Sequence, residues 1–109
     1  MSEIKGYHAH VYFDAADREK AERLCAEAGK AFAVTVGRMH DKPVGPHPRG
    51  SCQLTIGKEQ FTDVVSWLVL NRRGLTVFTH AQTGNALKDH TDHVIWLGPS
   101  ETLELSQFR

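Results

Sequence analysis

The sequence predicts an α+β fold in which two helices cover one face of an antiparallel sheet. Residues 7–13 alternate between apolar and polar side chains, which is typical of a strand with one buried face. Two later segments, 15–28 and 59–71, have the spacing of amphipathic helices, and each is followed by a further extended segment. This succession of strand and helix signals indicates one apolar layer between the helices and the sheet.

The first half of the chain is expected to hold three strands and the first helix. Asp14 is a candidate N-cap for that helix, and Gly29 is the candidate residue at which the helix ends. A second strand is expected over 32–36 and a third over 51–57. The segment 39–49 between them holds three of the four prolines and is expected to be an ordered loop.

The second half contains the second helix, with a stop at Gly74, and then a fourth strand over 75–80. A polar loop through 83–85 leads to a short added C-terminal strand over 94–97. The order β-α-β-β-α-β is the ferredoxin-like arrangement, in which the first and third strands are central and the fourth lies beside the first.

Composition predicts a single domain, 1–109, that acts on a small molecule. A chain of 109 residues with 40% apolar content has room for one modest core. Thirteen Lys and Arg balance thirteen Asp and Glu without a basic run, so we expect no nucleic-acid partner. Residues 1–5 have no apolar signal region and the apolar stretch 64–70 is too short to span a bilayer, so we expect a cytoplasmic protein and no membrane partner.

The seven histidines, His40 apart, lie in four short segments: 7–13, 45–48, 77–80 and 89–93. If the apolar alternate positions of the strands face the helices, the opposite face carries a polar and aromatic set: His8, His10, Tyr12, Phe78 and His80. The loop that bears His47 leads directly into the central third strand. We expect this face to be uncovered and to be closed by a second copy, giving a homodimer.

Clustered imidazoles are suited to metal binding and to proton transfer. Asp89 could orient a neighbouring imidazole, as carboxylates around metal sites do. The residues leave plainer interpretations open, because alternate histidines on a strand often only form hydrogen bonds across the sheet. The segment from Asp89 to His93 is equally consistent with a solvated turn.

Four blocks of sequence carry a family resemblance: YHAHVYF at 7–13, GPHP at 45–48, LTVFTH at 75–80 with TGN at 83–85, and DHTDHVIWLG at 89–98. In this order, and over nearly the whole chain, they resemble the small DOPA 4,5-dioxygenase family. The resemblance implies a ferredoxin-like fold, a dimer, and extradiol cleavage of a catechol ring by O2 at a non-haem Fe(II). The chain departs from the expected pattern at Ala81, where we expect a proline.

Within that interpretation, the expected metal ligands are His10, His47 and His80, and His8 is a fourth ligand or the catalytic base. His90 is the second candidate for proton transfer. For the substrate, we expect Tyr12 and Phe78 to stack on its ring, and Arg49 or Arg73 to bind its carboxylate. We expect Asp89 and His93 to lie behind the metal ligands and to orient them by hydrogen bonds. Asp89 is also the one candidate for a carboxylate ligand.

Two other classes of function stay open at this point. A hydrolase or isomerase using Zn2+, or another divalent metal, on the same histidines would have the same sequence pattern. A non-enzymatic dimer that binds a small molecule would need neither metal nor turnover.

Overall fold

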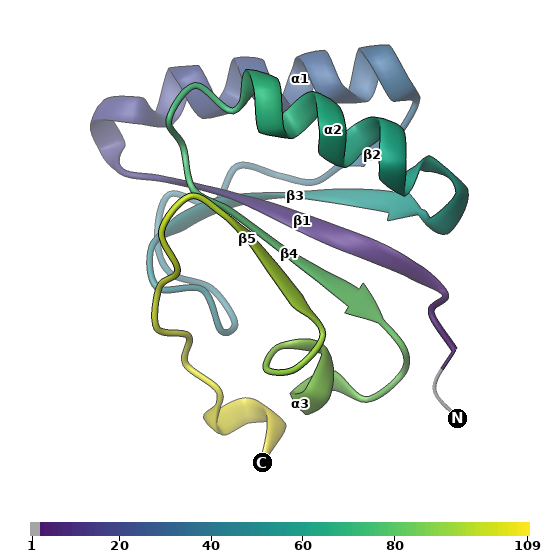
Figure 1. Ribbon diagram of the computed structural model, residues 1–109. Helices are drawn as coiled ribbons and strands as arrows, with labels where there is room; N and C mark the ends of the chain where they lie inside the picture. Colours follow the sequence, from purple (N-terminus) through teal and green to yellow (C-terminus); the bar gives the residue numbers. More distant parts are fainter. Residues whose placement is uncertain (1–2) are drawn as a thin grey trace.

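Five strands form one antiparallel sheet in the computed structural model of the protein, which describes residues 3–109. The spatial order is β2-β3-β1-β4-β5, and the strands are β1 (Gly6–Phe13), β2 (Thr35–Val36), β3 (Gly50–Gly57), β4 (Val77–Gln82) and β5 (Val94–Leu97). The helices α1 (Arg18–Phe32) and α2 (Phe61–Asn71) lie over the same face of the sheet, as Figure 1 shows. The order confirms the ferredoxin-like prediction, with β1 and β3 central and β5 added beside β4. That 1–109 is one domain stays a prediction, and residues 1 and 2 lie outside the described part.

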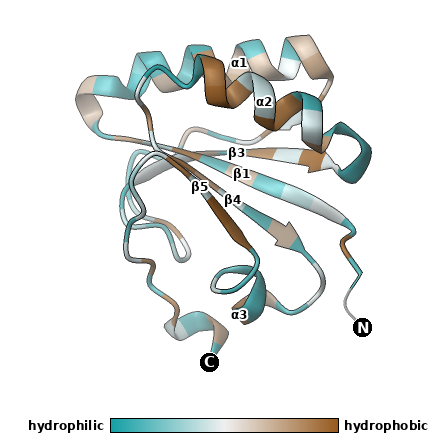
Figure 2. Ribbon diagram, viewed as in Figure 1, coloured by the Kyte–Doolittle hydropathy of each residue, from teal (hydrophilic) through white to brown (hydrophobic). Residues whose placement is uncertain are grey.

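The apolar core lies between the two helices and the sheet. Ala9, Val11, Cys52 and Leu54 of the central strands are fully buried against helix residues such as Leu24, as the strand alternation predicts. Figure 2 shows how differently the elements are composed, with hydrophobic residues prominent on α2 and β5 and mostly hydrophilic residues on α1. The core positions use one face of β1, β3 and β4, which leaves the other face free for polar chemistry.

Helix α1 does not end at Gly29, as the sequence analysis expects, but continues to Phe32 and is closed by Ala33 in the left-handed region at φ 56°. Gly29 has a packing role instead, because a Cβ at this position would lie 2.6 Å from Cγ2 of Val36. The helix therefore takes up the start of the expected strand 32–36, and β2 is reduced to two residues.

The second half also differs from its prediction in detail. Strand β4 is shifted two residues along the chain from the expected 75–80. Between β4 and β5, the expected polar loop leads into a short helix, α3 (Ala86–Asp89), whose first turn is capped by the Asn85 side chain accepting a hydrogen bond from the Lys88 amide. The three short 3-10 turns are Ala15–Asp17, Lys58–Gln60 and Ser106–Phe108.

The sheet face opposite the helices is not uncovered, which corrects a second expectation. Tyr12 and Phe78 on that face have no exposed surface, because the 39–49 loop and the segment after β5 fold over it. The amide of Glu104 donates to the carbonyl of Pro46, and so joins these two covering segments. The exposed surface that suggested a dimer is thus covered by the chain itself, and the homodimer stays a prediction.

Within residues 3–109, no helix combines the length and the apolar character needed to cross a membrane.

Candidate functional site

Three histidines converge where β1 lies beside β4. His8 is directly opposite His80 in the antiparallel register, and His10 lies two residues further along β1 on the same face. Each ring offers one nitrogen such that the three nitrogens lie within 4.8 Å of one another. We call His8, His10 and His80 the histidine triplet. Among the described residues, no carboxylate belongs to this group.

The backbone of β4 sets the orientation of His80. Its Nδ1 donates to the carbonyl oxygen of Ala81 at 3.0 Å, so in the neutral ring Nε2 carries the lone pair. That Nε2 lies 3.0 Å from Nε2 of His10. Ala81 continues the strand, because its own amide donates to the carbonyl of His93. The expected proline could not make that bond.

His47 borders the triplet from the 39–49 loop. Its ring centroid is 4.1 Å from that of His10. The Tyr12 hydroxyl lies 2.7 Å from Nδ1 of His47, and burial raises the pKa of Tyr12 and keeps the phenol protonated. We assign the hydroxyl as the donor of this hydrogen bond and Nδ1 of His47 as its acceptor. Nδ1 is therefore used by the protein, and Nε2 carries the proton in the neutral ring.

His90, at the end of α3, is held between two aromatic rings. Its Nδ1 donates to the carbonyl of Ala86 at 2.7 Å, and its ring lies 4.2 Å from that of His80 and 4.4 Å from that of Phe108. A cavity of about 220 Å³ opens beside it, lined by His8, His80, Gln82, Gly84, Ala86, Asp89 and His90. The triplet is thus accessible from one side.

Burial keeps the imidazoles of this site neutral. Desolvation, reinforced by neighbouring histidines, lowers the pKa of His47 to about 4 and that of His10 well below its usual value. Desolvation also lowers the pKa of His80 to about 4, although the hydrogen bond to Ala81 acts in the opposite direction. The pKa of the half-buried His8 is lowered by burial as well. Neutral rings keep the lone pair that metal binding requires.

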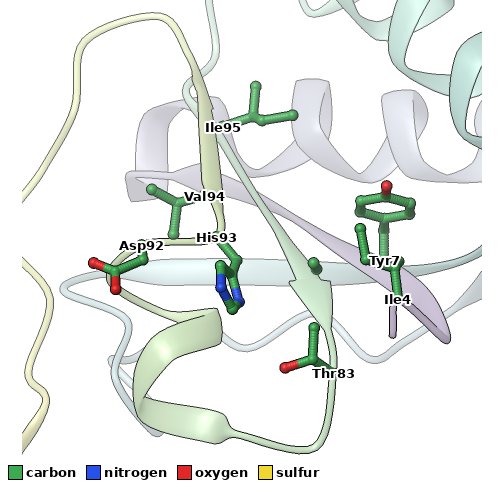
Figure 3. Close-up of a pocket in the computed structure, with 8 residues that line it drawn as sticks. Ile4, Tyr7, Thr83, Asp92, His93, Val94 and Ile95 are labelled. Atoms are coloured by element: carbon green, nitrogen blue, oxygen red, sulfur yellow. The ribbon is translucent and has the colours of Figure 1, made fainter. Parts of the chain in front are cut away.

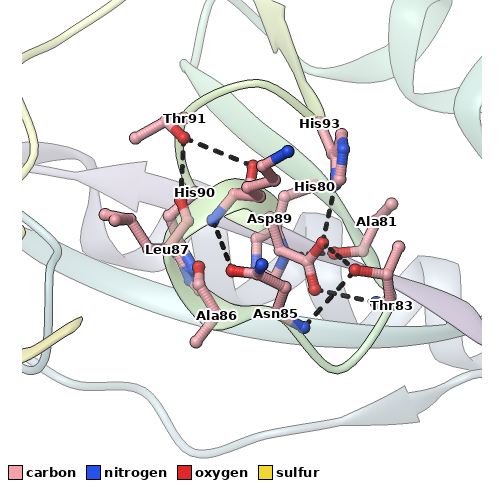
Figure 4. Close-up of polar contacts among 11 residues, drawn as sticks. His80, Ala81, Thr83, Asn85, Ala86, Leu87, Asp89, His90, Thr91 and His93 are labelled. Carbon is pink, nitrogen blue, oxygen red and sulfur yellow. Dashed lines mark hydrogen bonds and ion pairs between the residues drawn. The ribbon is translucent and has the colours of Figure 1, made fainter. Parts of the chain in front are cut away.

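Asp89 is fully engaged away from the triplet, as Figure 4 shows. Its two carboxylate oxygens accept hydrogen bonds from the amide and the hydroxyl of Thr83, both at 2.7 Å, and from Nδ1 of His93 at 2.8 Å. Burial raises its pKa, but these hydrogen bonds together lower it. Asp89 therefore orients an imidazole, as the sequence suggests, but that imidazole is His93 and not a member of the triplet.

Arg49 and Arg73, the two candidates for binding a substrate carboxylate, are both paired with carboxylates of the protein. Arg49 makes a two-pronged ion pair with Glu101, with N–O distances of 2.7 and 3.1 Å, and its guanidinium carbon lies 5.9 Å from the centre of the Tyr12 ring. It anchors the C-terminal segment. Arg73 follows α2 and pairs with Glu27 of α1, in the helix layer on the other face of the sheet. It is not in position to contact a ligand held by the triplet.

Tyr12 and Phe78 form the floor of the site, because both are completely buried. Phe78 stacks on Trp96 at 4.6 Å between centroids. The expectation that either ring stacks on a substrate does not fit this packing, since neither has an accessible face.

The sequence analysis gives no role to two neighbours of the histidines, Gln53 and Phe108. The Gln53 side-chain nitrogen lies 3.3 Å from Nε2 of His8, and the strand register could have revealed it, because Gln53 pairs with His10 across β1 and β3. Phe108 lies in a segment without hydrophobic periodicity, and no feature of the local sequence predicts its contact with His90.

Comparisons with known proteins identify a family for this chain. The model of the Dopa 4,5-dioxygenase family matches residues 7–107, which include every histidine of the site. The chain belongs to the Dopa 4,5-dioxygenase family. A fungal member, the DOPA 4,5-dioxygenase of Amanita muscaria, is 37% identical over 114 residues, covering 96% of this chain and 50% of its own length.

Two further proteins are similar to this chain. An uncharacterized 21.2 kDa protein of Botryotinia fuckeliana is 31% identical over 118 residues, covering 96% of this chain and 64% of its own length. The chain thus spans half to two thirds of these curated relatives. A crystal structure of a candidate dioxygenase from Nostoc punctiforme has a TM-score of 0.89 and 49% identity, covering 92% of this chain and 87% of the other.

Proposed function

We propose that the protein is an extradiol dioxygenase that opens the ring of a catechol, such as DOPA or caffeate, with O2 and a non-haem Fe(II). The observation that carries the proposal is the histidine triplet: three neutral imidazoles that converge beside a cavity, in a chain of the Dopa 4,5-dioxygenase family.

The donor set fits a divalent transition metal. Two ligands at about 2.1 Å from one ion and at right angles to each other are about 3 Å apart, and Nε2 of His10 and Nε2 of His80 are 3.0 Å apart. Imidazole suits Fe(II) as well as Zn2+. We therefore assign the ligands as His8, His10 and His80, with His8 in the place that the sequence analysis gives to His47. When bound, Fe(II) would let a catechol and O2 react side by side, on coordination positions that three protein ligands leave open.

His90 is suited to take the first proton. Because its Nδ1 donates to Ala86, the lone pair of the neutral ring lies on Nε2, and this nitrogen can accept a proton from a catechol hydroxyl in the adjoining cavity. His8, the other candidate base of the sequence analysis, is needed as a ligand in this arrangement.

His47 is suited to the opposite task. With Nδ1 held by the Tyr12 hydroxyl, Nε2–H can donate a hydrogen bond or a proton toward the space beside His10. The two histidines that flank the triplet thus present one acceptor and one donor, as a reaction that first removes and later returns a proton requires.

The proposed reaction balances without another reductant. The bond between one hydroxyl-bearing carbon of the catechol ring and its neighbour without a hydroxyl breaks. Each of these two carbons gains one oxygen atom from O2, and they become the carboxylic acid and the aldehyde. The ring is oxidised, O2 is reduced, and the product is a ring-opened hydroxy semialdehyde carboxylic acid. The product has as many hydrogen atoms as the catechol: of the two hydroxyl protons, one is on the new carboxylic acid and one is on the remaining hydroxyl.

The test is oxygen uptake by protein loaded anaerobically with Fe(II), with a panel of catechols that includes DOPA and caffeate. We expect one O2 consumed per catechol, a yellow product, and both atoms of labelled 18O2 in that product when it is analysed before exchange. Zn2+-loaded protein is the matched control and should consume no O2. Absence of uptake with every catechol would contradict the proposal, and retained Zn2+ with hydrolysis of an ester panel would favour the hydrolase alternative.

A further inference from the structure

A second hollow lies on the opposite face of the sheet from the histidine triplet. It has a volume of about 400 Å³, within the range of small-molecule sites, and its walls include Ile4, Tyr7, His93, Val94 and Ile95 (Figure 3). Tyr7 belongs to the helix-bearing face, because it alternates with His8 on β1 and its ring packs 4.2 Å from that of Phe61 in α2. The hollow is therefore separated from the triplet by the sheet itself.

The polar group of this hollow is a histidine held in one orientation. Nδ1 of His93 donates to Asp89, a buried residue that is only 4% exposed and whose carboxylate is itself fixed by two hydrogen bonds from Thr83 (Figure 4). Within residues 3–109, Nε2 of His93 has no partner, and it is not among the fully buried unpaired atoms. With Nδ1 protonated toward Asp89, the neutral ring offers Nε2 as a hydrogen-bond acceptor.

The side chains that line the hollow restrict the class of ligand that it can bind. Ile4, Tyr7 and Ile95 provide an apolar and aromatic surface, which favours an aromatic ring. Asp92 also lines the hollow, and its carboxylate disfavours an anionic ligand such as a benzoate. The ligand should also carry a group that donates a hydrogen bond to Nε2 of His93. An uncharged phenol has the aromatic ring, the lack of negative charge and the donor hydroxyl.

We propose that this hollow is a second ligand site, which binds an uncharged phenol with its ring against the apolar wall and its hydroxyl donating to Nε2 of His93. This site is distinct from the proposed catalytic site in position and in chemistry, since it needs no metal ion. Asp89 lies between the two, because it holds His93 and also lines the cavity beside His90.

The probe pair is phenol and anisole, which share the ring but differ in the donor hydroxyl. Each is titrated into metal-free protein with isotope-labelled methyl groups, and binding is followed by NMR. We expect saturable shifts for the methyls of Ala81 and Ile95, with phenol binding about fivefold more tightly than anisole because of one added hydrogen bond. Benzoate should bind more weakly than either.

Two variants separate the contributions. His93→Phe keeps an aromatic ring but removes the acceptor, so phenol and anisole should bind with equal affinity. Ile95→Lys changes an exposed position of the edge strand and should weaken both probes alike, which keeps the test valid if His93→Phe does not fold. Natively dispersed amide spectra of each variant serve as the folding control.

Several outcomes would overturn the proposal. Phenol shifts confined to Ala86 and the cavity beside His90 would place the phenol at the triplet instead. Equal affinities of phenol and anisole for the unaltered protein would remove the role of His93. Shifts of the Val94 and Ile95 methyls that depend on protein concentration without any probe would show that a second copy covers the hollow.

Discussion

At the scale of single residues, the partner of one ring nitrogen decides what the other nitrogen of each histidine can do. His80 and His90 both use Nδ1 as a donor to a backbone carbonyl, so their Nε2 atoms are acceptors. His47 accepts at Nδ1 from Tyr12, so its Nε2 is a donor. This difference separates histidines that the sequence alone presents as equivalent.

The assignment of ligands predicts a split between two kinds of alanine variant. His8→Ala, His10→Ala and His80→Ala should each lose stoichiometric metal binding, because each removes one of three donors. His47→Ala should keep the metal and lose turnover by about 10²–10⁴-fold, as expected for loss of a proton donor. Metal content after dialysis, measured by mass spectrometry, separates the two groups. The assignment is wrong if His47→Ala loses the metal while His8→Ala retains it.

The hydroxyl of Tyr12 is predicted to support His47. Tyr12→Phe keeps the buried ring but leaves Nδ1 of His47 without its donor, and should lower the free energy of unfolding by about 1–2 kcal/mol. Urea denaturation measures this loss. Tyr7→Phe is the matched control, because the half-buried Tyr7 hydroxyl makes no hydrogen bond with the side chains of residues 3–109. Equal stability of the two variants would show that the Tyr12–His47 bond contributes nothing.

At the scale of elements, the strands were predictable where one face packs against the helices. The alternation in β1 and β3 fixes which side chains face the helices, and it correctly assigns His8, His10 and Tyr12 to the other face. The end of α1 was not predictable in the same way. Gly29 has the local character of a helix stop, but its close approach to Val36 depends on packing that only the folded chain reveals.

The segment after β5 shows a second limit of sequence reasoning. It covers the polar face through single contacts, such as Glu101 with Arg49 and Phe108 with His90, and these contacts leave no periodic signal. The expectation of an uncovered face was therefore wrong, although nothing in the local sequence pattern contradicted it.

Glu101 is predicted to hold this segment in place. Glu101→Gln removes the charge from a pair whose side chains are 28% and 22% exposed, and should loosen the segment from the loop that bears His47. The amide of Glu104, which donates to Pro46, should then exchange its hydrogen about five- to tenfold faster, corresponding to about 1 kcal/mol. Glu27→Gln, which breaks the more exposed pair with Arg73, is the control and should leave the exchange of Glu104 unchanged. Unaltered exchange in Glu101→Gln would contradict this role.

At the scale of the whole molecule, the buried neutral histidines link folding to pH. His47 and His80 have a pKa of about 4 in the folded protein, against about 6.5 in an unfolded chain. Between these two values the unfolded state binds more protons, so stability falls as the pH falls from about 7 toward 4. At pH 5 each group should cost about 2 kcal/mol relative to pH 7.5.

Urea denaturation of metal-free protein at pH 7.5 and pH 5 measures this loss directly. His47→Gln should show a smaller loss, because it removes one of the buried histidines whose pKa is lowered. A free energy of unfolding that is the same at both pH values would show that these imidazoles are not neutral by burial.

The sequence predicted which histidines gather at the site, but it did not predict the role of each one. The four histidine segments and the β-α-β-β-α-β order correctly place His8, His10 and His80 on one face. The choice between His8 and His47 as a ligand depends on the Tyr12 hydrogen bond, and the position of Arg73 depends on its pairing in the helix layer. Such choices depend on distances of a few ångströms between segments remote in sequence, which residue spacing does not encode.

The most direct test of the central claim is the position of the metal ion in crystals of Fe(II)-loaded protein, located by anomalous diffraction at the iron absorption edge. The account predicts one peak at about 2.0–2.2 Å from one ring nitrogen each of His8, His10 and His80, with the bond between Tyr12 and His47 intact. A peak bound by His47 in place of His8, a peak on the other face beside His93, or no peak at the triplet would contradict it.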